Sequence, residues 1–115
     1  MTSLLTETWT DVCADGDLVP GRGVAAIIDD EAVAVFRLGD GRVFALSNVD
    51  PWSGAGVMAR GIVGSVGDRV VVASPMYKQH FDLTNGECVE DPEVVLPTFA
   101  VRVVNGRLEI GRRLG

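Results

Sequence analysis

Hydrophobic and polar positions alternate with a period of two along much of the chain. Residues 31–38 show it best, since Val33 and Val35 fall on one face while Phe36 and Leu38 fall on the other. Such alternation is typical of β-strands, whose successive side chains point to opposite sides. No segment keeps the helical period of 3.6 residues for more than about two turns. The pattern therefore predicts an all-β protein.

The predicted strands are short and are separated by residues that favour turns. They cover residues 9–13, 23–28, 31–38, 42–47, 62–63, 69–74, 81–83, 88–89, 94–96, 99–104 and 107–110. Turns are predicted at 29–30, 39–41, 85–86 and 105–106, and a longer connection at 64–68, where Asp, Asn and Gly recur. We expect one domain over residues 1–115, built as a small antiparallel β-sandwich or barrel.

Charge and composition narrow the class of partner. Sixteen acidic and ten basic residues give a net charge of −6, which disfavours nucleic acid and anionic membranes as partners. No apolar run approaches the roughly 20 residues that span a bilayer. Residues 1–7 lack the basic and then apolar pattern of a signal peptide. We therefore expect a cytoplasmic protein, with Cys13 and Cys88 reduced and buried as small hydrophobic residues.

Two loops, at about 48–60 and 74–80, contain the most distinctive motifs. The first includes Asp50-Pro51-Trp52-Ser53-Gly54, and the second reads Ser74-Pro75-Met76-Tyr77-Lys78-Gln79-His80 before Phe81-Asp82. Their proline, glycine and Phe-Asp positions resemble the two cluster-binding loops of a Rieske iron–sulfur domain, the second of which reads C-P-x-H-G-x-x-F-D. The resemblance implies a Rieske-like fold whose two loops lie side by side at one end.

The residues at the ligand positions of this pattern are different. Asp50 and Ser74 stand where the resemblance places cysteines, and Trp52 and Tyr77 stand where it places histidines. Iron–sulfur clusters require thiolate or imidazole ligands, whereas an indole offers no lone pair and a serine hydroxyl stays protonated near neutral pH. The chain also has only one histidine and two cysteines. We expect no cluster, and no catalytic, cofactor-binding or metal-binding residue.

Three segments resemble one particular family. They are Asn48-x-Asp50-Pro51, Arg60-Gly61-Ile62 and residues 74–83, and they look like the small subunit of the assimilatory NAD(P)H-dependent nitrite reductase. The resemblance implies a non-catalytic subunit of a cytoplasmic enzyme that reduces nitrite to ammonium in nitrate assimilation. It also implies a large subunit that carries FAD, a [4Fe–4S] cluster and sirohaem. The alternatives are a stand-alone Rieske-type ferredoxin, an unrelated protein-binding β module, or a small enzyme using Asp50, Tyr77 and His80.

Several loop residues allow two interpretations. Trp52, Met76 and Tyr77 either pack together at the loop tips or form an apolar contact for a partner, with Lys78 beside them facing an acidic surface. Asp50 is better explained as a turn residue bonding nearby amides than as an acid–base group. His80 is better explained as a hydrogen-bonded structural residue than as a proton relay.

Four glycines lie in or near the first loop, namely Gly54, Gly56, Gly61 and Gly64. Their spacing fits neither a dinucleotide-binding motif nor a P-loop, and no helix start follows them. We expect them to serve backbone conformation.

Overall fold

The computed structural model describes residues 8–114, and its regular structure is almost entirely β-strand. The strands are β1 (Thr10–Ala14), β2 (Val24–Ile28), β3 (Glu31–Arg37), β4 (Val43–Ser47), β5 (Ile62–Val66), β6 (Arg69–Ala73), β7 (His80–Asp82), β8 (Thr98–Val104) and β9 (Arg107–Arg113). The helical segments of the described chain are two short 3₁₀ turns, η1 (Asp15–Asp17) and η2 (Met58–Arg60). The all-β prediction is confirmed.

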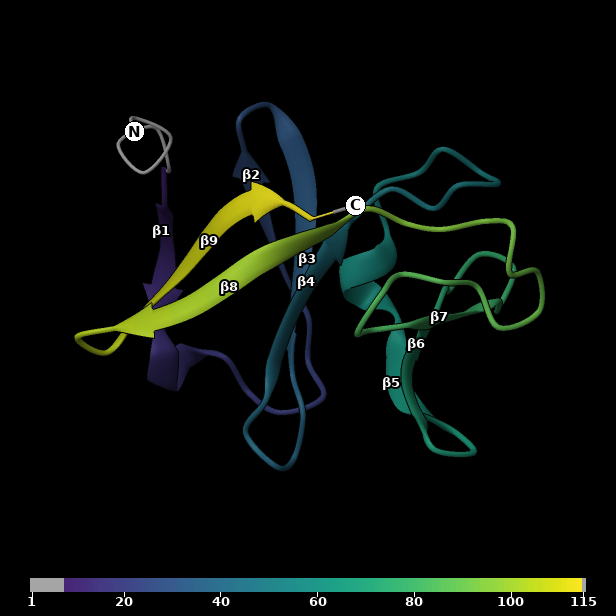
Figure 1. Cartoon of the computed structure of the whole chain (residues 1–115), viewed down its shortest axis with the longest axis horizontal. Helices are drawn as coiled ribbons and strands as arrows, with labels where there is room; N and C mark the ends of the chain where they lie inside the picture. The colour runs from purple at the N-terminus through teal and green to yellow at the C-terminus, as the bar shows by residue number, and fades with distance from the viewer. Residues whose placement is uncertain (1–7, 115) are drawn as a thin grey trace.

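The strands form two antiparallel sheets. The larger has six strands in the order β1-β9-β8-β4-β3-β2, and the smaller has three in the order β5-β6-β7. Every paired strand in both sheets runs antiparallel to its neighbour. Figure 1 shows the small sheet on the right of the molecule, beside the larger sheet on the left.

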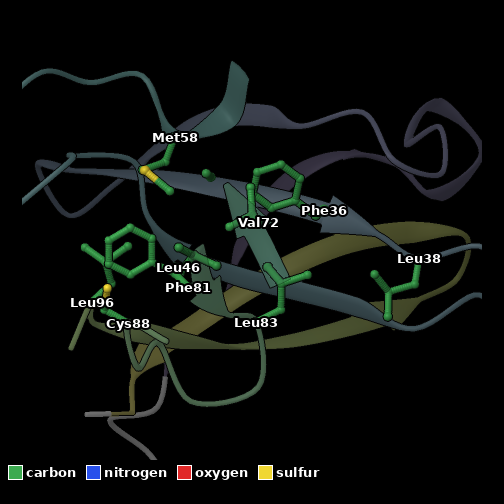
Figure 2. Packing of buried hydrophobic residues seen from close by; sticks show 10 residues of the cluster. Phe36, Leu38, Leu46, Met58, Val72, Phe81, Leu83, Cys88 and Leu96 are labelled. Atoms are coloured by element: carbon green, nitrogen blue, oxygen red, sulfur yellow. The ribbon is translucent and has the colours of Figure 1, made fainter. Parts of the chain in front are cut away.

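Strand β3 contributes to two separate hydrophobic clusters. Val33 and Val35 pack in one cluster with residues of the large sheet, including Leu108 and Ile110. Phe36, from the opposite face, packs in a second cluster that includes Met58, Val72 and Phe81 (Figure 2). The alternation predicted for this strand is confirmed, and burial of both faces makes β3 the centre of the fold.

The connection between β5 and β6 differs from the prediction. We expected a loop over 64–68, but Gly64 and Ser65 belong to β5 and pair with Val71 and Val70. The turn is confined to Gly67 and Asp68, because Gly67 adopts a left-handed conformation with φ of 60°. The strands expected at 88–89 and 94–96 are reduced to the isolated bridges Phe81–Cys88 and Glu87–Val95.

The two cysteines differ in burial. Both thiols are free, but only Cys88 is buried, so the expectation was wrong for the partly buried Cys13. Burial raises the pKa of both thiols, which makes neither a reactive thiolate.

Within residues 8–114 no helix is long and apolar enough to cross a bilayer. The signal-peptide expectation for residues 1–7 lies outside the described residues.

Candidate functional site

Each of the two proline loops is closed by its own backbone hydrogen bonds. In the first loop the Asp50 N–H donates to the Ala55 carbonyl at 2.8 Å, and the Gly54 N–H donates to the Asp50 carbonyl at 2.8 Å. In the second loop the Lys78 N–H donates to the Ser74 carbonyl at 2.9 Å. The side chains at residues 50 and 74 are therefore held by hydrogen-bonded local turns.

A side-chain hydrogen bond joins the two loops. The Ser74 hydroxyl donates to Oδ2 of Asp50, and both residues are buried, with exposures of 1% and 0%. Oδ1 of Asp50 accepts the N–H groups of Trp52 at 2.8 Å and Ser53 at 2.9 Å. The expected side-by-side arrangement of the loops and the turn role of Asp50 are both confirmed. The two residues at the cysteine positions of the Rieske pattern bond to each other.

The environment of Asp50 keeps it ionised. Burial alone would raise its pKa, but the hydrogen bonds from the Ser74 hydroxyl and from the Ser53 and Trp52 amides outweigh burial, so the pKa lies below its usual value. Both oxygens of this buried carboxylate accept hydrogen bonds, two of them from amides of its own turn. Asp50 therefore stabilises its own turn and joins the two loops.

The apolar residues at the loop tips are exposed. Trp52, Met76 and Tyr77 have exposed fractions of 42%, 46% and 56%. Trp52 packs partly inward, because its ring lies 6.0 Å from that of the buried Phe81 in a tilted arrangement. Internal packing thus accounts for part of Trp52, while Met76 and Tyr77 face solvent.

His80 is paired with an acidic residue of the segment after β7. Its Nδ1 lies 2.6 Å from Oε2 of Glu90, and its main-chain N–H donates to Oε1 of Glu90 at 2.8 Å. Burial would raise the pKa of Glu90, but the hydrogen bonds from the His80 backbone and ring lower it overall. His80 is thus hydrogen-bonded, as the structural interpretation expects. Asp50 bonds to Ser74 whereas His80 bonds to Glu90, and within residues 8–114 no hydrogen bond joins Asp50 to His80.

Two polar residues that sequence reasoning missed also position the loops. The buried Asn48 accepts the Ala59 N–H at 2.7 Å through its Oδ1 and so fixes the first loop to η2. Arg69 bonds to Asp82 at 2.9 Å and to Glu87 at 2.7 Å, which fixes β6 to the end of β7 and the following turn. The sequence placed Asn48 in a family motif, but only its burial in the structure reveals its role. Nothing in the local sequence indicated the partners of Arg69.

The residues at this site do not fit an iron–sulfur cluster. The four ligand positions offer a carboxylate, an indole, a hydroxyl and a phenol, and the first and third of these bond to each other. His80 contacts Glu90, and neither cysteine lies in these loops. Among residues 8–114 no group of three or more His, Cys, Asp or Glu side chains could hold a metal ion. The donor set lacks the soft ligands that such a cluster requires.

The fold and the paired loops define a class of protein, and comparison with known families agrees with it. A family model described as a Rieske-like [2Fe-2S] domain matches residues 8–111. The chain belongs to the Rieske-like domains, and within them to the family of nitrite reductase small subunits.

The second part of that assignment depends on close relatives. The nitrite reductase (NADH) small subunit of Escherichia coli K12 is 38% identical over 103 residues, which cover 89% of this chain and 95% of the relative. The solved structure of a Mycobacterium tuberculosis protein, described as an NADH-dependent nitrite reductase small subunit, is 50% identical. It superposes with a TM-score of 0.89, covering 95% of this chain and 98% of the other.

A third relative shows the same domain inside a longer protein. The nitrite reductase [NAD(P)H] large subunit of Klebsiella oxytoca is 35% identical over 112 residues, which are 96% of this chain but only 12% of that large subunit. In that protein a domain like this one is thus covalently joined to a large subunit.

Proposed function

We propose that this chain is a non-catalytic subunit of a cytoplasmic NAD(P)H-dependent nitrite reductase and that it supports the large subunit. The observation that carries the proposal is its similarity to the E. coli small subunit over nearly the full length of both chains. The Klebsiella large subunit adds support, because fusion of a related domain fits two chains that act together. The large subunit would carry FAD, a [4Fe–4S] cluster and sirohaem and would reduce nitrite to ammonium in nitrate assimilation.

The chain itself would hold no cluster. Support comes from the bond between Ser74 and Asp50, which uses the two loop positions for mutual hydrogen bonding and leaves no sulfur or imidazole ligand there. A cytoplasmic location is supported by two cysteines that form no disulfide. The scaffold would therefore serve protein contact.

The contact would include the exposed loop tips, Trp52, Met76, Tyr77 and Lys78. Aromatic residues and methionine are enriched at the centres of protein interfaces, where they contribute large apolar area. The tips combine these residues in two rigid loops that are joined by a buried hydrogen bond. Such preorganisation limits the entropy lost on binding.

Co-purification tests the main proposal. The tagged chain is co-expressed with the nitrite reductase large subunit, and the expected result is a complex that survives gel filtration. Iron analysis and the visible spectrum of the small chain alone should show no cluster. A chain that never binds the large subunit, or that contains two irons per molecule as a ferredoxin would, contradicts the proposal.

A substitution at the tip tests the contact surface. Tyr77→Ala should weaken binding to the large subunit by about tenfold or more, as expected for an aromatic interface residue. Ile27→Ala is the matched control, because Ile27 is 67% exposed on β2 and also presents apolar surface. Equal binding by both variants would place the interface elsewhere.

A further inference from the structure

The outer face of the small sheet carries a groove that extends from β5 to the second loop and is bordered there by Lys78. Val63, Val72 and Phe81 point inward, where they belong to or pack against the second hydrophobic cluster. Their neighbours along the strands, such as Ile62 and Gly64, lie on the opposite face of the sheet. These residues line an open, mainly apolar groove of about 580 Å³. Ile62 is 76% exposed. The groove is thus a second unpartnered surface.

Gly64 opens this groove, and the backbone gives no reason for a glycine there. A Cβ built on Gly61 would lie 2.5 Å from the Ala73 carbonyl oxygen, so Gly61 is sterically required. A Cβ on Gly64 meets no atom within 4 Å, and its φ lies outside the left-handed region. Glycine inside a strand is unfavourable by about 0.5–1 kcal/mol relative to alanine. An interior strand glycine without local need often marks a place where another chain or a ligand approaches closely.

The charges that border the groove are positive although the chain carries a net charge of −6. Arg60 and Lys78 line it, are exposed, and form no ion pair within residues 8–114. His80 also lines it, and its carboxylate partner Glu90 is already engaged by the His80 ring and backbone. Two unpaired cations beside apolar surface favour an acidic occupant.

Lys78 has a backbone conformation that is unfavourable for a non-glycine residue. Its φ is 64°, in the left-handed region that glycine tolerates best, and the Rieske-type loop pattern has a glycine at this position. A non-glycine residue there is disfavoured by about 1 kcal/mol or more. Strained residues of this kind concentrate at binding sites. The side chain at position 78 is thus present despite a cost in stability.

We propose that this groove binds an acidic segment of the large subunit. An apolar side chain of that segment lies over Gly64, and neighbouring carboxylates pair with Arg60 and Lys78. The inference rests on the proposed function and deepens it, because it adds a second contact surface with a defined chemistry. Lys78 borders both the groove and the loop tips, so one partner can cover the two surfaces together. A second copy of the chain fits less well, since two molecules of charge −6 repel each other.

Filling the groove tests the proposal without endangering the fold. Gly64→Val places a β-branched side chain into open space in β5, so the variant should fold with unchanged or higher stability. Its affinity for the large subunit, measured by titration, should fall by at least about tenfold because the groove is blocked. Ala25→Val is the matched control, since Ala25 is exposed on β2 in the large sheet, and its affinity should equal that of wild type.

Reversing one charge tests the acidic character of the partner. Lys78→Glu should weaken binding more at low than at high salt, because screening reduces the effect of the charge. Arg112→Glu changes the net charge equally at an exposed position of β9 and should leave binding unchanged.

The outcomes separate this inference from the proposed function. Failure of the wild-type chain to bind the large subunit would overturn both. Wild-type binding that Gly64→Val leaves unchanged would overturn the groove and leave the subunit role standing. Sedimentation of the free chain as a dimer that Gly64→Val dissociates would identify a second copy as the occupant and contradict the inference.

Discussion

The bond between Asp50 and Ser74 is the central interaction at the scale of single residues. It joins two loops that are 24 residues apart in the sequence and buries a carboxylate together with the hydroxyl that donates to it. A buried charge is tolerated only when its hydrogen bonds are complete. Loss of one donor should therefore affect the stability of the whole site.

Ser74→Ala removes that donor. We expect the free energy of unfolding in urea to fall by about 1–3 kcal/mol, the usual effect of losing a hydrogen bond to a buried charged group. Ser65→Ala is the control, because Ser65 is exposed on β5. Equal urea midpoints for Ser74→Ala and Ser65→Ala would mean that the bond between Asp50 and Ser74 contributes nothing to stability.

The same carboxylate should make stability depend on pH. The pKa of Asp50 in the folded chain lies below the value of about 3.9 that it has when unfolded. The unfolded state then binds more protons, so Asp50 contributes stability above about pH 4 that is lost as the pH falls through the folded pKa. Asp50→Asn should be less stable at neutral pH and should lose less stability on acidification. Urea unfolding of the wild type and Asp50→Asn across a pH series measures this. An equal loss of unfolding free energy on acidification in both proteins would contradict the prediction.

At the scale of elements, two glycines at β5 have opposite requirements: Gly61 lies just before the strand and Gly64 lies inside it. Gly61→Ala forces a Cβ against the Ala73 carbonyl and should destabilise by about 1–3 kcal/mol. Gly64→Ala meets open space and should stabilise by about 0.5–1 kcal/mol, since alanine restricts the unfolded chain. Thermal or urea unfolding of the pair measures both, and each variant is the control for the other. Similar changes of the same sign would show that the local geometry differs from that described.

For the whole molecule, the two hydrophobic clusters share strands and should unfold together. β3 contributes Val35 to one cluster and Phe36 to the other, and β4 contributes Ala45 and Leu46 in the same way. Neither cluster can lose its packing without disturbing strands that the other needs.

The two tryptophans provide a probe for each half. Trp9 stacks against Arg102 of the large sheet, with 4.1 Å from the guanidinium carbon to the ring centroid, and Trp52 contacts Phe81 of the small sheet. Trp52→Phe and Trp9→Phe each leave one fluorescent reporter. For each variant, the urea transition followed by fluorescence should coincide with the transition followed by circular dichroism. A separate, earlier transition at Trp52 would mean that the small sheet and its loops form an independent unit.

The sequence by itself determined the chemistry that the loops can and cannot supply. Side-chain identity is a local property, so the absence of thiolate and imidazole at positions 50, 52, 74 and 77 follows without a structure. Strand alternation likewise revealed both faces of β3, because the period of two is a property of the backbone.

Only the tertiary structure decided which of these groups meet. Asp50 with Ser74 and Arg69 with Asp82 are contacts made across loops and strands, and no local rule specifies partners at that separation. The groove at Gly64 could also be found only from the tertiary structure. In a sequence, a glycine that leaves open space looks the same as a glycine whose Cβ would clash with a neighbouring residue. What distinguishes them is the space around the missing Cβ, and packing of the sheet alone sets that space.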